Sequence, residues 1–178
     1  MNLSIRKTND SDLSEIMRVE EKAFGYPKEA ELVHDLLKDQ TAEPRISLLA
    51  FDGDEAIGHI LFTAVKIEGS DIVASILAPL AVVPKFQKKG LGDNIINAGL
   101  DLLREAGVSV VFVLGHPTYY PKYGFAPVHP RAINAPYPIP EEYRDAWMMQ
   151  ILDDTAPDSI SGTVTVSDKL GKPEHWRE

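Results

Sequence analysis

The beginning of the chain carries two patterns in which apolar side chains recur every three or four positions, the spacing of one helix face. The first pattern spans Asp10–Phe24 and starts beside Asn9, a residue type that often caps helix N-termini. The second follows Pro27 and runs from Leu32 to Leu37. We expect one amphipathic helix in each stretch.

Three longer apolar runs follow, and each ends in residues that favour turns. The runs are Ile46–Phe51, Ala56–Ile67 and Ile72–Val83. Because the connections between them are short and contain glycine, the pattern predicts three neighbouring antiparallel strands.

A third amphipathic pattern lies at Asp93–Ala106, and Gly107 is well placed to end the helix that it predicts. Its expected inward side is formed by Ile95, Ile96, Gly99, Leu102, Leu103 and Ala106. Val108–Leu114 is almost continuously apolar, so we expect a strand that is covered on both faces. A strand, a helix and a strand in this order predict a right-handed crossover and a parallel pair.

The last third of the chain has weaker patterns. A short helix is expected over Thr118–Tyr123, ended by Gly124, with a strand starting at Phe125. Five prolines between 127 and 140 predict a loop that lies over the body of the protein. Further strands are expected at Ala146–Leu152 and Thr163–Val166. Without a shift in composition that would mark a boundary, residues 1–178 are predicted to form a single domain.

Composition narrows the classes of function. With 27 acidic and 18 basic residues the net charge is −9, which argues against a general nucleic-acid binder. The absence of cysteine excludes disulfides, thiolate metal sites and cysteine nucleophiles, and the histidines lack metal-ligand spacing. No apolar run approaches the ~20 residues of a membrane span. Since Met1–Asp10 does not look like a signal peptide, we expect a cytoplasmic protein. The missing cysteines and the spacing of the histidines predict that it has no metal cofactor.

The most informative stretch is Pro84–Gly92, which joins the third strand to the third helix. Its Gln87-x-x-Gly90-x-Gly92 pattern would gather several backbone N–H groups at a helix N-terminus, where unpaired donors and partial positive charge favour an anion. Lys88 and Lys89 add full charges. The order of residues differs from both the NTPase phosphate loop and the Gly-x-Gly-x-x-Gly dinucleotide fingerprint.

About thirty residues later comes Tyr120-Pro-Lys-Tyr-Gly-Phe125. Together with the Gln87–Gly92 pattern, this run resembles the GNAT family of acyl-CoA-dependent N-acetyltransferases. Leu80-Ala-Val-Val-Pro84 and Gly115-His-Pro-Thr-Tyr-Tyr120 are most similar to a predicted N-acetyltransferase branch of that family. The resemblance covers a core of about residues 2–128, leaving 129–178 as a loop and C-terminal strands.

The resemblance implies an α/β (α+β) fold, in which a mixed, mostly antiparallel central sheet has a V-shaped splay and is flanked by helices. Acetyl-CoA would be the co-substrate, with its pantetheine against the strand edge and its pyrophosphate on the N–H groups of the loop. The residues that this assigns to the cofactor are Leu80, Ala81, Val82, Gln87, Lys88, Lys89, Gly90, Leu91, Gly92 and Asp93. The N–H of Leu80 or Ala81 could stabilise the oxyanion.

Tyr120 is the candidate general acid, because a phenol can protonate the leaving thiolate. Its neighbour Tyr123 is expected to pack against Phe125. The glutamate that many family members carry before the loop is missing, since Leu77-Ala-Pro-Leu-Ala81 has no carboxylate. The general base therefore stays open among His116, Glu20, Glu21, His59 and a water chain.

His116, at a strand end, is favoured as the base, and His59 is expected to be structural. Glu20 and Glu21 lie late in the first helix, where family members often contact the substrate, so both are predicted to bind the acceptor.

The predicted function is transfer of an acetyl group to a primary amine by direct attack in a ternary complex. The alternative is a non-catalytic acyl-CoA-binding module that regulates or senses. The acceptor is either a small molecule or a peptide amine, at a chain terminus or a lysine, and its side of the site would be shaped by residues 127–140 and the tail after Leu152. No nucleic-acid or membrane partner is expected, and the protein is predicted to be a monomer or a homodimer.

Overall fold

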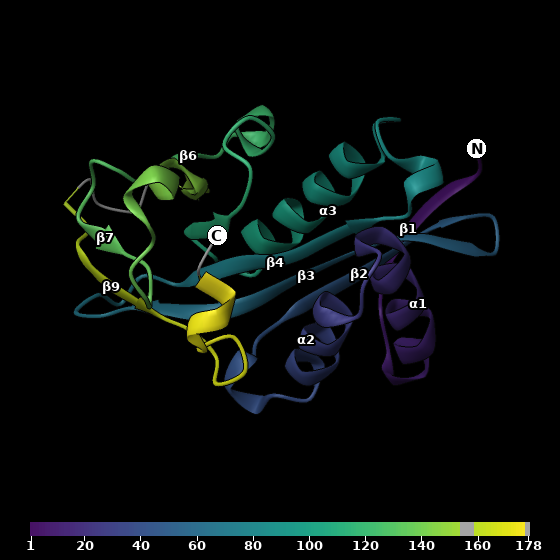
Figure 1. The fold of residues 1–178 in the computed structure, drawn as a ribbon, viewed down its shortest axis with the longest axis horizontal. Helices are drawn as coiled ribbons and strands as arrows, with labels where there is room; N and C mark the ends of the chain where they lie inside the picture. Colours follow the sequence, from purple (N-terminus) through teal and green to yellow (C-terminus); the bar gives the residue numbers. More distant parts are fainter. Residues whose placement is uncertain (154–158, 177–178) are drawn as a thin grey trace.

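The computed structural model describes residues 1–153 and 159–176, and it contains a mixed sheet with helices on both faces (Figure 1). The main strands are β1 (Leu3–Lys7), β2 (Ile46–Asp52), β3 (Glu55–Ile67), β4 (Ala74–Val82), β5 (Val110–Leu114), β8 (Trp147–Ile151) and β6 (Ala126–Pro127), in this spatial order. Within this path β4 and β5 are parallel and the other neighbours are antiparallel, as expected for the predicted fold class.

The three central strands follow the sequence pattern closely. β2, β3 and β4 pair in chain order, and the crossover from β4 through a helix to β5 gives the predicted parallel pair. The sequence analysis did not predict β1, which pairs with β2 from Leu3↔Asp52 to Lys7↔Leu48. β1 is short and lies at the edge of the sheet, and its alternation of apolar and polar residues is the only local signal that it gives.

Two helices, α1 (Leu13–Phe24) and α2 (Lys28–Leu37), cover one face of the sheet, and α3 (Leu91–Glu105) covers the other (Figure 1). The Asn9 side chain accepts a hydrogen bond from the Ser11 N–H and caps the 3-10 turn η1 (Asp10–Asp12), which leads into α1. Ala106 was expected on the inward side of the third helix, but it is exposed because α3 ends one residue earlier and the chain turns at Gly107.

The helix α3 approaches the sheet closely because a glycine lies on each side of the contact, one on β3 facing α3 and one on α3 facing β3. A Cβ on Gly58 of β3 would lie 2.5 Å from the Ile95 side chain. A Cβ on Gly99 of α3 would clash with the ring of Phe62. This close contact sets the distance between α3 and the sheet, and therefore also the position of the loop at the N-terminus of α3.

The C-terminal part completes the same core. The proline-rich segment contains the short strand β7 (Ile133–Asn134), which pairs with β9 (Gly162–Thr165), and β9 also pairs with the end of β3. Trp147 stacks on Phe112 at 5.0 Å between ring centroids, and Trp176 packs edge-on against Trp147 at 5.7 Å. Remaining turns are η2 (Gln40–Ala42), η3 (Pro84–Phe86), η4 (Tyr120–Tyr123), η5 (Glu141–Ala146) and η6 (Pro173–Trp176).

Candidate functional site

The strands β4 and β5 separate in the middle of the sheet. Their register runs from Ala74↔Val110 to Leu77↔Val113, while β4 continues to Val82. On the other edge of β4, the register with β3 shifts around Pro79, so β4 carries an extra residue at this point. The backbone of residues 80–82 therefore lies past the last pair with β5, at the splay that the family resemblance implied.

The loop after β4 forms an open helix N-terminus. Gly90 is the N-cap of α3 with φ 83°, and no side chain of the described residues caps it. Lys88 also has a left-handed backbone, with φ 60°. The first N–H groups of α3 have no partner inside the helix, so they remain available to an anion. The Gln87 side chain donates to the Val82 carbonyl at 2.8 Å and ties the loop to the end of β4.

The second glycine of the motif has a different role. A Cβ on Gly92 would clash with the hydroxyl of Tyr119, which lies against the first turn of α3. Tyr123 also reaches this turn, since its hydroxyl donates to Asp93 Oδ1 at 2.6 Å. The expectation that Tyr123 packs against Phe125 is therefore wrong. It is Tyr120 that contacts Phe125, edge-on at 5.8 Å.

Tyr120 lies beside the splay. Its half-buried ring covers Gly115, the residue after β5, where a Cβ would lie 2.5 Å from the ring. Burial raises the pKa of the Tyr120 phenol, and the neighbouring Tyr119 adds to this effect. The phenol is therefore protonated at neutral pH, although the raised pKa also makes it a weaker acid than an exposed tyrosine. His116 comes directly after Gly115, on the same connection, and is exposed. Its backbone carbonyl accepts a hydrogen bond from the Tyr119 N–H at 3.1 Å.

The acidic residues of α1 have very different environments. Glu21 is exposed, whereas Glu20 is fully buried and its Oε2 lies 2.7 Å from His59 Nδ1. Burial raises the pKa of Glu20, although the hydrogen bond to His59 opposes this shift. The other ring nitrogen of His59 lies 2.8 Å from the Ser47 hydroxyl. Sequence reasoning did not single out Ser47, because the contact joins residues on different strands and leaves no local pattern.

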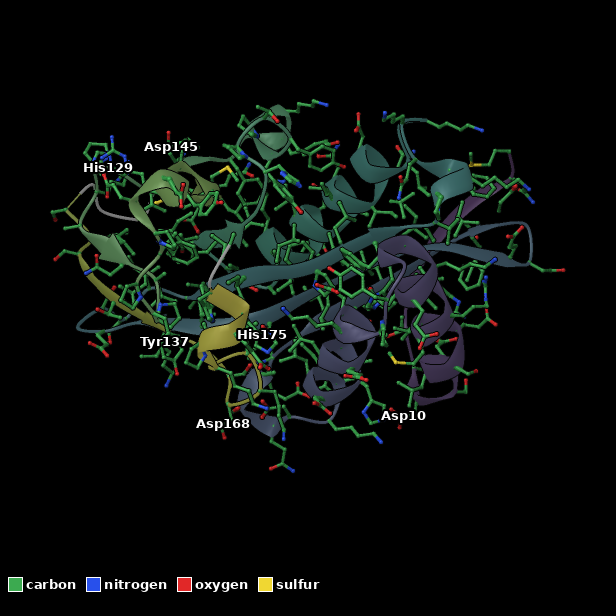
Figure 2. All side chains as sticks on the ribbon, viewed as in Figure 1. Asp10, His129, Tyr137, Asp145, Asp168 and His175 are labelled. Atoms are coloured by element: carbon green, nitrogen blue, oxygen red, sulfur yellow. The ribbon has the colours of Figure 1, made fainter. Side chains whose placement is uncertain are left out.

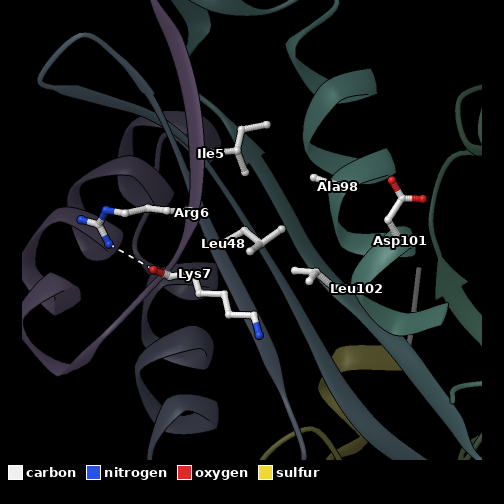
Figure 3. Close-up of a pocket in the computed structure, with 7 residues that line it drawn as sticks. All are labelled: Ile5, Arg6, Lys7, Leu48, Ala98, Asp101 and Leu102. Atoms are coloured by element: carbon white, nitrogen blue, oxygen red, sulfur yellow. Dashed lines mark hydrogen bonds between the residues drawn. The ribbon is translucent and has the colours of Figure 1, made fainter. Parts of the chain in front are cut away.

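Two surface hollows lie away from the splay. The first, of about 350 Å³, lies between β1, β2 and α3 (Figure 3). It is lined by Ile5, Arg6, Lys7, Leu48, Ala98, Asp101 and Leu102. The second, of about 370 Å³, lies between α1 and α2. Neither is lined by residues of the loop or of the β4 end, and the candidate site is described by its strand pairing and backbone geometry.

Two further histidines lie away from the splay, and potential metal ligands do not cluster in the described residues. His129 lies at the edge of the molecule where β7 is found, and His175 lies on the turn η6 (Figures 1 and 2). Among residues 1–153 and 159–176, no group of three or more potential ligands could hold a metal ion. In the same ranges, none of the helices is both long and apolar enough to cross a membrane.

Comparisons with known proteins agree with the geometry. The family model described as an acetyltransferase (GNAT) domain matches residues 4–128. The chain is 47% identical over 164 residues to the Escherichia coli K12 protein named uncharacterized N-acetyltransferase YjhQ, covering 90% of each chain. It is 33% identical over 144 residues to the protein named uncharacterized N-acetyltransferase YhbS, covering 80% of this chain and 83% of the relative.

Two solved structures are similar over nearly the whole chain. The crystal structure of YhbS from Escherichia coli in complex with CoA has a TM-score of 0.87 and 29% identity, covering 97% of this chain and 93% of that one. A GNAT family acetyltransferase from Brucella melitensis in complex with acetyl-CoA has a TM-score of 0.74 and 28% identity, covering 94% and 97%.

Proposed function

Since the chain belongs to the GNAT acetyltransferase family, we propose that it transfers an acetyl group from acetyl-CoA to a primary amine by direct attack in a ternary complex. The observation that carries the proposal is the combination of the β4–β5 splay with an uncapped helix N-terminus at its mouth. The complexes of two similar proteins with CoA and acetyl-CoA support the choice of cofactor.

The residues present fit this cofactor. The pantetheine would lie along Leu80, Ala81 and Val82, where β4 has passed its last pair with β5. The pyrophosphate would be held by the N–H groups from Lys88 to Gly92, a loop that also contains Leu91. Gln87 would hold the loop in shape through Val82, and Lys89 would add charge. Asp93 would contribute its N–H, because its carboxylate is engaged by Tyr123.

Catalysis would need a donor for the leaving thiolate and an acceptor for the proton of the amine. Tyr120, which packs against Gly115 and Phe125, would take the first role. For the second role the chain offers His116, which is exposed near Tyr120, and the buried pair of Glu20 and His59. Glu21 is exposed and lines the hollow between α1 and α2, so it would contact a part of the acceptor that extends beyond the splay. Glu20, on the buried side of α1, would act on the ammonium group.

The first test is a screen for acetyl transfer. Purified protein with acetyl-CoA would be given small primary amines and lysine-containing peptides in separate reactions, and both free CoA thiol and acetylated product would be measured. The proposal predicts amine-dependent thiol release with a matching acetylated product. Thiol release without any acetylated amine, or no reaction although acetyl-CoA binds, would contradict it and favour a sensor.

Replacing Tyr120 with phenylalanine tests the general acid. Since general acid catalysis contributes roughly 10²–10⁴-fold, we expect Tyr120→Phe to lower kcat by about 10²-fold and to leave the acetyl-CoA Kd within about twofold. The matched control is Tyr143→Phe, which alters an exposed tyrosine on η5. Unchanged kcat in Tyr120→Phe would exclude Tyr120 from proton transfer.

A further inference from the structure

Four polar side chains are joined by hydrogen bonds in a row that begins on the buried side of α1 and ends at the surface. Glu20 Oε2 lies 2.7 Å from His59 Nδ1, and His59 Nε2 lies 2.8 Å from Ser47 Oγ. Ser47 in turn accepts a hydrogen bond from Thr8 Oγ1 at 2.8 Å. Glu20 and His59 are fully buried, Ser47 is nearly so, and Thr8 is half-buried at the end of β1. We call these four residues the buried polar chain.

The inner end of the buried polar chain is unusual for a structural ion pair. Glu20 Oε1 is buried and has no hydrogen-bond partner among the residues that the structure describes, although buried carboxylate oxygens are normally paired. In the described part of the chain, Glu29 Oε2 on α2 is a second buried carboxylate oxygen without a partner. The charge of Glu29 acts on Glu20 in the same direction as burial does, disfavouring the ionised form of Glu20.

The inner end also lies close to the splay. His59 of β3 is directly opposite Ala81 of β4, so their Cβ atoms are about 5 Å apart on the same face of the sheet. The helix α1 packs over both strands, which brings Glu20 to this level. The buried polar chain therefore starts next to the strand edge where the reacting thioester is proposed to lie, on the face opposite α3.

We propose that the buried polar chain is a proton path, which receives the proton of the acceptor ammonium at Glu20 Oε1, through a water molecule, and releases a proton to solvent at Thr8. The source of this proton rests on the proposed acetyl transfer. The path itself depends only on the four side chains, each of which can both accept and donate a proton in the required order. It also supplies the base that is missing from Leu77–Ala81 of β4.

The protons balance through the reaction. The ammonium loses one proton to Glu20 and becomes a neutral amine, whose lone pair forms the C–N bond while the C–S bond breaks. The nitrogen then loses a second proton, and Tyr120 supplies one to the thiolate and is reprotonated by that second proton. For each proton that Glu20 receives, His59 takes one at Nδ1 and passes one from Nε2 to Ser47, and Thr8 releases one to solvent. The hydrogen bond that Thr8 donates to Ser47 is the arrangement after this release. The two hydroxyls and the His59 ring then reorient, which restores the starting directions of the hydrogen bonds. Glu20 and Tyr120 are the catalytic groups here, and His59, Ser47 and Thr8 are positioning residues that act through Glu20.

The path can be tested without knowing the acceptor. The exchange of the His59 ring N–H with solvent would be measured by NMR in full-length protein bound to acetyl-CoA. We expect exchange that is fast for a fully buried group, and at least tenfold slower exchange in Ser47→Ala and in Thr8→Val, which break the path at two different places. The matched control is Ser75→Ala, which removes another buried serine hydroxyl, one that donates to the Thr63 carbonyl.

Equal exchange rates in wild type, Ser47→Ala and Thr8→Val would overturn the path, since a sealed structural pair does not depend on Ser47 or Thr8. With an amine found by the screen, the same two variants should lower kcat about tenfold at unchanged KM for acetyl-CoA, and Ser75→Ala should not. If exchange depends on Ser47 but no amine is acetylated, the path stands and the proposed function fails. If amines are acetylated and both variants turn over normally, only the catalytic use of the path fails.

Discussion

At the scale of single residues, an ion pair and a capping box stabilise the turn η1 that leads into α1. Arg6 on β1 binds Asp12 through two hydrogen bonds of 2.8 and 2.9 Å. Asp12 also accepts from the Asn9 N–H at 2.8 Å and completes a capping box. The hydrogen bond from Arg6 lowers the pKa of Asp12 to about 2, against the effect of burial.

The Arg6–Asp12 pair predicts a pH dependence of stability. Because the folded pKa of Asp12 is below its unfolded value, its contribution is present above about pH 5 and is lost as the pH falls toward 2. We expect Arg6→Gln to cost about 1 kcal/mol at pH 7, allowing for the exposure of Arg6, and this difference to disappear near pH 2. Urea unfolding at several pH values would measure it.

The control for this prediction is Arg104→Gln, which removes an exposed pair with Asp101 on α3. It should change the unfolding free energy by less than about 0.5 kcal/mol at any pH. A cost of Arg6→Gln that stays constant from pH 7 to pH 2 would show that Asp12 is not the group that Arg6 stabilises.

At the scale of elements, the fit of α3 on β3 controls the position of the phosphate loop. The contact of Gly99 with the Phe62 ring leaves no room for a side chain. Gly99→Ala should therefore overpack the interface and cost about 1–3 kcal/mol, lowering the thermal midpoint by roughly 2–10 °C. Calorimetry would measure the midpoint, and affinity for acetyl-CoA should weaken as the N-terminus of α3 shifts.

The matched control is Asn97→Ala, an exposed position on the same helix, which should stay within about 0.5 kcal/mol of wild type. A Gly99→Ala protein as stable as wild type would mean that Phe62 can turn away, and that the close approach of α3 does not depend on glycine.

Most elements could be predicted from the sequence because their signals are local. The periodicity of apolar residues and the turn residues predicted α1, α2, α3 and the central strands. The glycines of the Gln87–Gly92 motif predicted the loop before α3. The pairing of Glu20 with His59 could not be predicted, since it depends on which helix face meets which strand. The role of Gly92 was also beyond local reasoning, because its neighbour Tyr119 comes from the next connection along the chain.

At the scale of the whole molecule, the C-terminal segment closes the core that the first part begins. Trp176 is buried, packs on Trp147 and donates its ring N–H to the Leu170 carbonyl at 3.0 Å. If residues 1–178 form one domain, unfolding should be a single transition. Trp176→Ala should then destabilise that whole transition by about 3–5 kcal/mol.

Denaturant unfolding followed by fluorescence and by circular dichroism would test this prediction, with the exposed Glu174→Ala as control. Coincident curves that shift together for Trp176→Ala are expected. Two separate transitions, or a Trp176→Ala protein whose main transition is unchanged, would show that the C-terminal segment is an independent unit.

The distribution of charge agrees with an anionic ligand at the loop. The chain has a net charge of −9, yet lysines gather around the N-terminus of α3. Lys85 and Lys89 lie over the Phe86 ring, and Lys122 lies 5.2 Å over the Tyr119 ring. A locally basic loop on an acidic protein favours a phosphorylated cofactor over nucleic acid.

The central claim, an acetyl-CoA site built on the splay and the loop, is tested most directly by thermal unfolding with acetyl-CoA, CoA and ATP in separate samples. A ligand at about 100 times its Kd adds ~2.7 kcal/mol of stability, which should raise the midpoint by roughly 5–10 °C for a chain of this size. A rise with acetyl-CoA and CoA but not with ATP is the predicted result. No rise with either CoA species, or an equal rise with ATP, would contradict the claim.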